Sequence, residues 1–326
     1  MIVALFLTLA AQSADTGGAG LYQAWCSKCH GVDGRGNAAH QTHLSVRPAD
    51  LADCKVSSTE TEDGWVDVVR DGGAAHGLSL DMPAFGGSAT PEQLRAVVRY
   101  LRSLCRERGW PPGELNFPRA FLAEKAYPEN EAVVSLRGDE QEYIYERRIG
   151  RRAQMEASAR TVVDSEGRPF DGVTAALKYN VWYSAARRAI ASVGIEATPP
   201  IGREDLWEVE PYVSVGVSPA AAVAVQGEVS ATWQESGGIA GFSYSVGIGR
   251  EMGRFVPELE LGGTLPRGGS GTLSLVPQVR IQLSRLGHVA GSIGVELPVQ
   301  GPEPRHPRLT AFVLWDYGDA GLFRGW

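Results

Sequence analysis

Apolar and polar side chains alternate along most of the chain from residue 131 to residue 326, and this period constrains the fold more than any other feature. In residues 273–283 the odd positions are Leu, Leu, Pro, Val, Ile and Leu, whereas most even positions are Ser, Gln or Arg. Residues 153–163 and 221–233 repeat the pattern. Because successive side chains of a strand point to opposite faces, each segment is predicted to be a β-strand with one apolar and one polar face.

Turn residues separate these segments, most of which are about 9–12 residues long. The segments begin near residues 131, 141, 152, 172, 187, 206, 220, 240, 253, 272, 287 and 308. No part of this region predicts a long helix. We therefore predict an all-β antiparallel domain over residues 131–326, with about 12 strands and a range of about 10–12.

Two structures produce such strands. A soluble barrel or sandwich turns its apolar faces inward, whereas a transmembrane β-barrel turns them to lipid and keeps a polar interior. Here the polar faces carry both Glu and Arg, and the apolar faces are aliphatic with hardly a charge. Aromatic residues such as Trp182, Trp207 and Trp315 lie near segment ends, and the chain ends on Trp326. These features favour a transmembrane β-barrel over a soluble all-β domain, because aromatic girdles mark the membrane interfaces of barrels.

Residues 15–109 have a different pattern, with all four cysteines of the chain and signals for helices. Two helices are predicted, over residues 18–29 and 90–105. The second has a capping box formed by Thr90 and Gln93, followed by apolar residues at helical spacing. The breaker sequence Trp-Pro-Pro-Gly ends this region, so we predict an all-α domain over residues 15–109 and a linker over residues 110–130.

The sequence Cys26-Ser27-Lys28-Cys29-His30 is a CxxCH motif. Two thiols at this spacing reach the two vinyl groups of one haem, and the next residue places an imidazole on the iron. A zinc site would need a second close pair of ligands, and the other two cysteines stand alone. The motif therefore predicts one covalently attached haem c, held by Cys26 and Cys29, with His30 as an axial ligand of the iron.

Met82 is the predicted second axial ligand. It lies in the sequence Asp-Met-Pro-Ala-Phe-Gly, where a stiff proline follows it. Thioether sulfur is a soft ligand that raises the reduction potential of haem iron. The competing ligands are His40, His43 and His76 in this domain and, in the β region, Met155 and Met252; the alternative role for Met82 is that of a core residue.

Cys54 and Cys105 remain after the haem motif. In an oxidising compartment such a pair forms a disulfide. Closing this loop would stabilise the folded protein by on the order of 4 kcal/mol; the alternative is two buried free thiols. Export is also indicated by the N-terminus, where residues 1–11 are almost wholly apolar and small residues follow. We predict a signal peptide over residues 1–14, although no Lys or Arg precedes the apolar run; a buried N-terminal strand or helix is the alternative.

Residues 15–109 resemble a class I monohaem cytochrome c. The resemblance rests on Gly18 and Tyr22 before the CxxCH motif, the Met82-Pro83 pair after it, and Tyr100 in the terminal helix. It implies that Gly18 and Tyr22 pack against Tyr100. It also implies a haem pocket lined by five further residues: Pro48, near His30, and Trp65, Leu80, Phe85 and Leu94. The layout of the whole chain is similar to that of fused cytochrome–porins of bacterial outer membranes, whose barrels are larger.

A haem with two axial protein ligands suits one-electron transfer. The first hypothesis is therefore an outer-membrane electron-transfer protein, with redox proteins or an external donor or acceptor as partners and the cytochrome domain facing the periplasm. The second is a pore or receptor barrel gated or plugged by a redox-sensing cytochrome domain. The third is a soluble periplasmic carrier with a β docking domain. The net charge of -7 argues against nucleic acid as a partner. We expect an electron carrier, with no catalytic residues, rather than an enzyme with its own substrate.

Overall fold

The computed structural model describes residues 17–38, 43–162, 170–202, 205–284, 287–302 and 306–318. The predicted signal peptide, His40 and Trp326 lie outside these residues. The chain divides into two compact units, Met1–Glu107 and Arg108–Trp326, which are described separately.

The first unit is helical, as predicted. Its elements are α1 (Gly18–Trp25), α2 (Ser27–His30), α4 (Cys54–Ser57), α5 (Glu62–Asp71), the 3-10 helix η1 (Gly73–His76) and α6 (Pro91–Arg102). None of the described helices is long and apolar enough to cross a membrane.

Helices α1 and α6 cross closely. A Cβ atom on Gly18 would lie 2.1 Å from the carbonyl oxygen of Ala96, so a larger residue would force the two helices apart. Next to this crossing, the rings of Tyr22 and Tyr100 lie 5.3 Å apart. Gly18, Tyr22 and Tyr100 thus meet as the resemblance implies, and their contact joins the first helix of the unit to the last.

Helix α6 begins at a capping box. The Thr90 side chain accepts a hydrogen bond from the backbone of Gln93, whose side chain accepts one from the Thr90 backbone. Two backbone N–H groups that lack helical partners are thereby satisfied. The buried side chains of α6 form one apolar stripe along the helix: Leu94, Val97, Val98 and Leu101.

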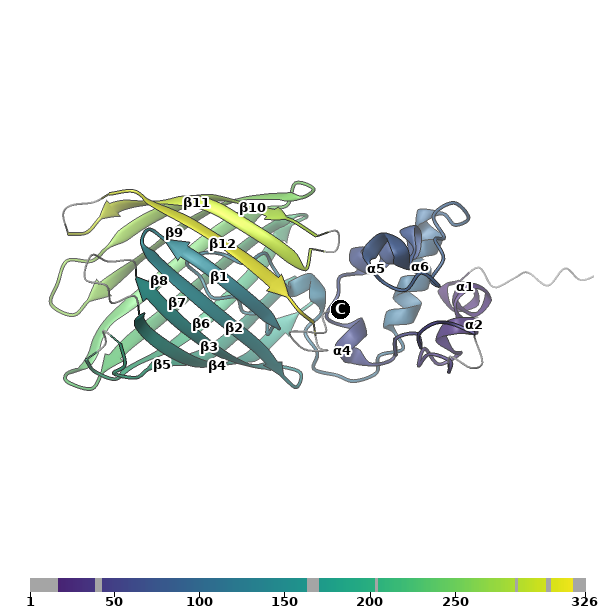
Figure 1. Cartoon of the computed structure of the whole chain (residues 1–326), viewed down its shortest axis with the longest axis horizontal. Coiled ribbons are helices and arrows are strands. Elements are labelled where there is room, and N and C mark those ends of the chain that lie inside the picture. The colour runs from purple at the N-terminus through teal and green to yellow at the C-terminus, as the bar shows by residue number, and fades with distance from the viewer. Residues whose placement is uncertain are drawn as a thin grey trace, which may run out of the picture. The chain divides into compact units, whose positions relative to one another are not determined.

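The second unit is a closed barrel of twelve antiparallel strands, which confirms the predicted fold class (Figure 1). The strands are β1 (Glu131–Arg137), β2 (Glu140–Ile149), β3 (Ala153–Val162), β4 (Phe170–Ser184), β5 (Ala189–Thr198), β6 (Glu208–Ala220), β7 (Val223–Gln234), β8 (Gly238–Arg250), β9 (Phe255–Pro266), β10 (Leu273–Gln282), β11 (Val289–Gln300) and β12 (Arg308–Asp316). Each strand pairs with its neighbours in sequence, and β1 pairs with β12 to close the barrel. Every strand begins close to the position that the alternation predicts.

The barrel wall has its apolar face outside and its polar face inside. Leu177, Ile293 and Val313 are 59%, 57% and 54% exposed on the outer surface. Glu146 and Ser214, in contrast, are fully buried in strands of the same barrel. This is the arrangement of a barrel that meets lipid outside and holds polar groups within.

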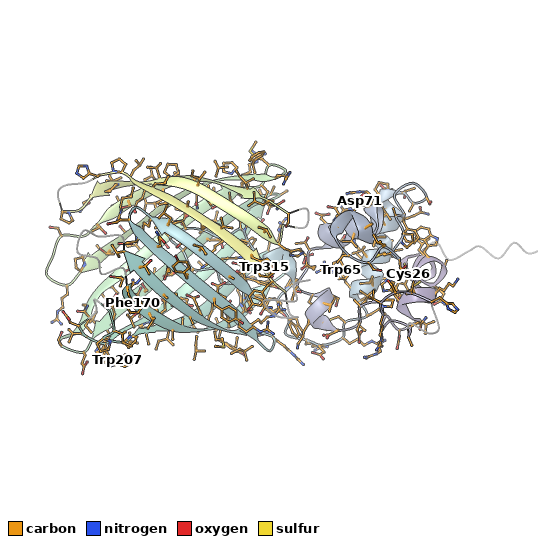
Figure 2. The ribbon with its side chains drawn as sticks, in the orientation of Figure 1. Cys26, Trp65, Asp71, Phe170, Trp207 and Trp315 are labelled. Atoms are coloured by element: carbon orange, nitrogen blue, oxygen red, sulfur yellow. A yellow bond between two sulfur atoms is a disulfide. The ribbon has the colours of Figure 1, made fainter. Side chains whose placement is uncertain are left out.

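The two ends of the barrel differ in their connections. At the end where β1 begins and β12 ends, the connections are residues 150–152, 185–188, 221–222, 251–254 and 283–288. At the opposite end several are longer, namely residues 163–169, 199–207, 267–272 and 301–307. We call these the terminal end and the loop end. Aromatic side chains are found at both, with Phe170 and Trp207 near the loop end and Trp315 near the terminal end (Figure 2).

Residues 113–130, which we call the plug, differ from the predicted linker because they belong to the barrel unit and lie in its interior. The plug starts with the 3-10 helix η2 (Gly113–Leu115). Leu115, Phe117 and Tyr127 of the plug form an apolar cluster with Ile190 of the wall. The high apolar content of the segment explains its burial, since a solvated linker would expose these side chains.

Side chains of the wall satisfy the backbone of the plug. Glu260 of β9 accepts hydrogen bonds from the N–H groups of Phe121 (2.6 Å) and Leu122 (2.8 Å). The side-chain amide of Gln226, on β7, donates a hydrogen bond to the Pro118 carbonyl (2.6 Å). Buried irregular backbone needs such partners, so the polar inner face of the wall and the plug stabilise each other.

Candidate haem site

The CxxCH motif lies where α1 meets α2. Its backbone is fixed by hydrogen bonds from the N–H of His30 to the Cys26 carbonyl (2.9 Å) and from the Tyr22 hydroxyl to the Gly31 carbonyl (2.7 Å). Cys26 and Cys29 are half-buried free thiols, so neither is used in a disulfide. Burial, with a smaller contribution from Cys29, raises the pKa of the Cys26 thiol to about 11.

His30 has the properties of a metal ligand. Burial lowers the pKa of its imidazole, and the nearby Ala49 backbone opposes this effect less strongly. The neutral imidazole, which coordinates metals, is therefore the favoured form. Among the described residues, the buried Nδ1 atom of His30 has no hydrogen-bond partner.

The Met82 loop lies against α5 and α6. The Met82 carbonyl accepts a hydrogen bond from the N–H of Gly73 (3.1 Å), and the side chain packs against a buried cluster that includes Val69 and Val98. Trp25, just before Cys26, stacks on Phe85, with ring centres 5.7 Å apart. The stacking joins the end of α1 to the loop that carries Met82.

Three of the five predicted lining residues gather with Met82. Trp65, Phe85 and Leu94 belong to or pack on the same cluster. Leu80 is 85% exposed and lies outside this cluster. Pro48 is half-buried and lies beside Gly36 rather than in the cluster.

The competing ligands are placed differently. His76 Nε2 lies 3.2 Å from the Asp67 carbonyl oxygen and 3.5 Å from an Asp71 carboxylate oxygen, so this nitrogen of the ring is already engaged. His43 is exposed in a loop. Met155 and Met252 belong to the barrel unit. These placements support Met82 as the proposed second ligand.

The structure joins Cys54 and Cys105 in a disulfide, with their Cα atoms 5.0 Å apart. This separation lies in the ordinary range for a disulfide. The bond links the start of α4 to the chain after α6, and both cysteines follow the CxxCH motif in the sequence.

Comparison with known protein families matches residues 13–101 to the family described as "Cytochrome C oxidase, cbb3-type, subunit III". These residues form a cytochrome c domain. No curated protein sequence matches the chain.

A cytochrome c domain implies covalent haem c, and the residues present fit this group. Two free thiols and a neutral imidazole stand at the required spacing. Trp65 adds a second buried polar atom, Nε1, that has no partner among the described residues. In the same unit the Nδ1 atom of His76, a competing ligand, is also buried without a partner among the described residues.

The barrel is similar to several solved structures. The COG4313 outer membrane channel from Pseudomonas putida F1 has 11% identity and a TM-score of 0.48, covering 61% of this chain and 98% of its own. The KdgM porin has 8% identity and a TM-score of 0.44, covering 57% and 96%. LpxR from Salmonella typhimurium has 10% identity and a TM-score of 0.35, covering 57% and 99%.

Sequence reasoning missed the charged network between plug and wall. Arg119 Nη1 pairs with Glu131 (3.2 Å) and Glu146 (2.9 Å), and Lys178 Nζ pairs with Glu124 (2.6 Å). The signal that could have revealed it is the mixture of aromatic and charged residues in 115–130, which is unusual for a linker. The partners themselves are too distant in sequence to be found from local patterns.

Proposed function

We propose that this protein is an outer-membrane cytochrome that carries a single haem c and transfers single electrons at or across the membrane. One observation supports this most directly, namely that a cytochrome c domain and a closed barrel with an apolar outer face occur in one chain. The barrel would anchor the redox domain. Redox proteins or an external donor or acceptor would be its partners.

In this proposal Cys26 and Cys29 hold the haem, and His30 and Met82 are its axial ligands. When bound, haem c with two protein ligands supplies one-electron redox chemistry without an open coordination position. The chain's own residues orient and shield the group. Trp65, Phe85 and Leu94 exclude water from the Met82 side, while Gly18, Tyr22 and Tyr100 hold the CxxCH helix in place.

The lengths of the connections support a periplasmic position for the cytochrome domain. Bacterial outer-membrane barrels have short periplasmic turns and longer external loops. Here the longer connections cluster at the loop end, whereas β1 begins at the terminal end. The chain therefore enters the barrel from the side assigned to the periplasm, and residues 15–109 would lie on that side.

The plug favours an anchor over a constantly open pore. Residues 113–130 occupy part of the interior and bond to several strands of the wall. Conductance of liposomes containing the full-length protein measures this directly. Low conductance supports the anchor, whereas steady solute-sized currents would favour the pore or receptor hypothesis.

The central test is the location and reduction of the haem in intact cells. We expect a pyridine haemochrome signal in the detergent-extracted outer-membrane fraction and reduction of that haem by partner proteins or an external donor. The matched control is Cys26→Ala/Cys29→Ala, which should give an outer-membrane barrel without covalent haem. Haem found only in the soluble periplasmic fraction would exclude the proposal and favour the soluble carrier.

A further inference from the structure

A cavity of about 360 Å³ lies inside the barrel, between the plug and the wall. Its lining is rich in carboxylates. Eight glutamates and three arginines line it: Glu124, Glu140, Glu142, Glu156, Glu196, Glu208, Glu210 and Glu228, with Arg119, Arg137 and Arg160. Walls of one predominant charge in a region of low dielectric concentrate ions of the opposite charge, so this chamber attracts cations.

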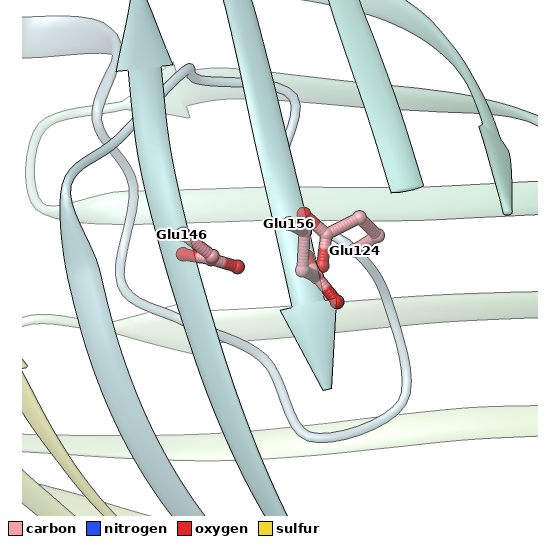
Figure 3. Close-up of side chains that lie close together, drawn as sticks. All are labelled: Glu124, Glu146 and Glu156. Carbon is pink, nitrogen blue, oxygen red and sulfur yellow. The ribbon is translucent and has the colours of Figure 1, made fainter. Parts of the chain in front are cut away.

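Three carboxylates meet where the plug reaches this chamber. Glu124 comes from the plug, Glu146 from β2 and Glu156 from β3 (Figure 3). One oxygen of each lies within 4.8 Å of the others. Figure 3 shows Glu146 directed from its strand toward the other two side chains.

Two further observations separate this group from an ordinary acidic cluster. Glu146 is fully buried, yet its Oε2 atom has no hydrogen-bond partner among the described residues. Glu146 and Glu156 are also direct partners in the register of β2 and β3. Like charges directly opposite each other destabilise a strand pair, and of these two carboxylates only Glu146 pairs with a cation, Arg119, among the described residues.

The nearby cations do not balance the carboxylates. The plug and the adjoining wall bring together three cations and five carboxylates: Arg119, Lys125 and Lys178, with Glu124, Glu129, Glu131, Glu146 and Glu156. With all five carboxylates ionised, two negative charges are left over, and the chamber lining as a whole also has more glutamates than arginines. Uncompensated buried charge is strongly unfavourable, and one divalent cation would neutralise the excess of two.

A second acidic group, Glu129, Glu131 and Glu146, is a weaker candidate. The Lys125 ammonium already contacts Glu129 and Glu131, and Arg119 pairs with Glu131 and Glu146, so every carboxylate of this group has a cation partner. In the first group Lys178 pairs with Glu124 and Arg119 with Glu146, but Glu156 has no ion pair among the described residues. Arg119 pairs with Oε1 of Glu146, and the other oxygen, Oε2, has no hydrogen-bond partner among the described residues.

We propose that Glu124, Glu146 and Glu156 bind one hard divalent cation inside the barrel. Carboxylate oxygens alone are the donors that Mg²⁺, Ca²⁺ and Mn²⁺ prefer. Glu124 and Glu156 line the chamber, which gives the cation an approach and room for water ligands. Bound there, the cation joins the plug to two strands of the wall. The proposal is independent of haem and of electron transfer.

The test uses Mn²⁺ as the probe on full-length protein in detergent, stripped with EDTA, with free Mn²⁺ followed by its EPR signal. We expect one Mn²⁺ per chain, displaced by Ca²⁺ or Mg²⁺. Glu156→Gln removes one ligand and should weaken binding at least about 10-fold, the effect that even outer-shell changes have on metal sites. It also removes the repulsion between β2 and β3, so the barrel should still fold.

Glu208→Gln is the matched control, because Glu208 lines the same chamber outside the three-carboxylate group and should leave the Mn²⁺ affinity unchanged. Three results would overturn the proposal: no Mn²⁺ bound by the stripped protein, an unchanged affinity in Glu156→Gln, or an equal loss in both variants. Cys26→Ala/Cys29→Ala should bind Mn²⁺ like the parent, so failure here and failure of the proposed function are distinguishable.

Discussion

The two units of this chain sort their side chains in opposite ways. In the cytochrome c domain Val97 and Val98 are fully buried, and the charged residues of α6 face outward. In the barrel, Leu177 and Val313 are more than half exposed, whereas Glu146 is fully buried. The same residue types thus occupy the inside of one unit and the outside of the other.

A single rule accounts for both arrangements. Apolar surface leaves water wherever it can, and for a small helical domain the available place is its own interior. A twelve-stranded barrel offers its outer surface to lipid instead, and its interior must then satisfy polar groups. The opposite burial of apolar and polar side chains in the two units therefore follows from what surrounds each unit, rather than from a difference in composition.

The largest difference between the effects on the two units is expected from Cys26→Ala/Cys29→Ala. This change removes both thioether bonds, so covalent haem should be lost entirely while the barrel still assembles, because the two cysteines belong to the other compact unit. Haem staining of denatured protein, beside the yield of folded barrel, measures the two effects. Loss of the barrel together with the haem would show that the units do not fold separately.

The next largest effect is expected inside the barrel, where charge is buried. Arg119→Met leaves Glu131 and Glu146 without their shared partner and should lower the free energy of unfolding by about 3–5 kcal/mol. Urea unfolding in detergent, followed by fluorescence, measures it. Arg70→Met is the control, since the exposed pairs of Arg70 with Asp67 and Asp71 should each contribute at most about 1 kcal/mol. Equal costs would contradict the distinction between buried and exposed charge.

Three substitutions at two leucines test the comparison most directly. Leu101→Ala opens the buried core of the cytochrome c domain and should cost about 2–5 kcal/mol. Leu177→Ala, on the outer face of β4, should cost far less in a bilayer, because lipid chains are as apolar as leucine. Leu177→Arg should restore a cost of about 2–4 kcal/mol. Unfolding in lipid vesicles measures all three, and a harmless Leu177→Arg would place this face in water.

The smallest effect is expected at the start of α6. Thr90→Ala removes the capping hydrogen bond to the Gln93 backbone and should lower the stability of the cytochrome c domain by about 1 kcal/mol. Thermal unfolding followed at the haem absorption measures it. Thr90→Ser keeps the hydroxyl and should remain close to the parent protein. A loss in Thr90→Ser as large as in Thr90→Ala would assign the effect to packing.

The parts of the fold that the sequence predicted are those set by local patterns. The alternation of apolar and polar side chains predicted the positions of the strands, because a two-residue period at these lengths indicates a β-strand. The capping box of Thr90 and Gln93 placed the start of α6. Helix α5 was not predicted, because Gly64 and three valines lower its helix propensity. Its cap at Thr61 and its end at Gly72, with φ of 80°, were the signals available.

The plug could not be predicted in the same way. Its position depends on bonds such as that between the Phe121 N–H and Glu260, which lie 139 residues apart in sequence. Leu80 shows the same limit in the candidate site, because its type fits a haem pocket but its exposure of 85% is set by the loop around it. Residue types identify candidates, and the tertiary fold decides which of them meet.

The plug has a consequence for how the barrel is made. Residues 113–130 precede β1, but their backbone is held by Glu228 of β7 and Glu260 of β9, which are synthesised much later. The segment can therefore make these hydrogen bonds only when the later strands are in place. Pairing of β1 with β12 closes the barrel and encloses the segment. The barrel thus assembles around a part of its own chain.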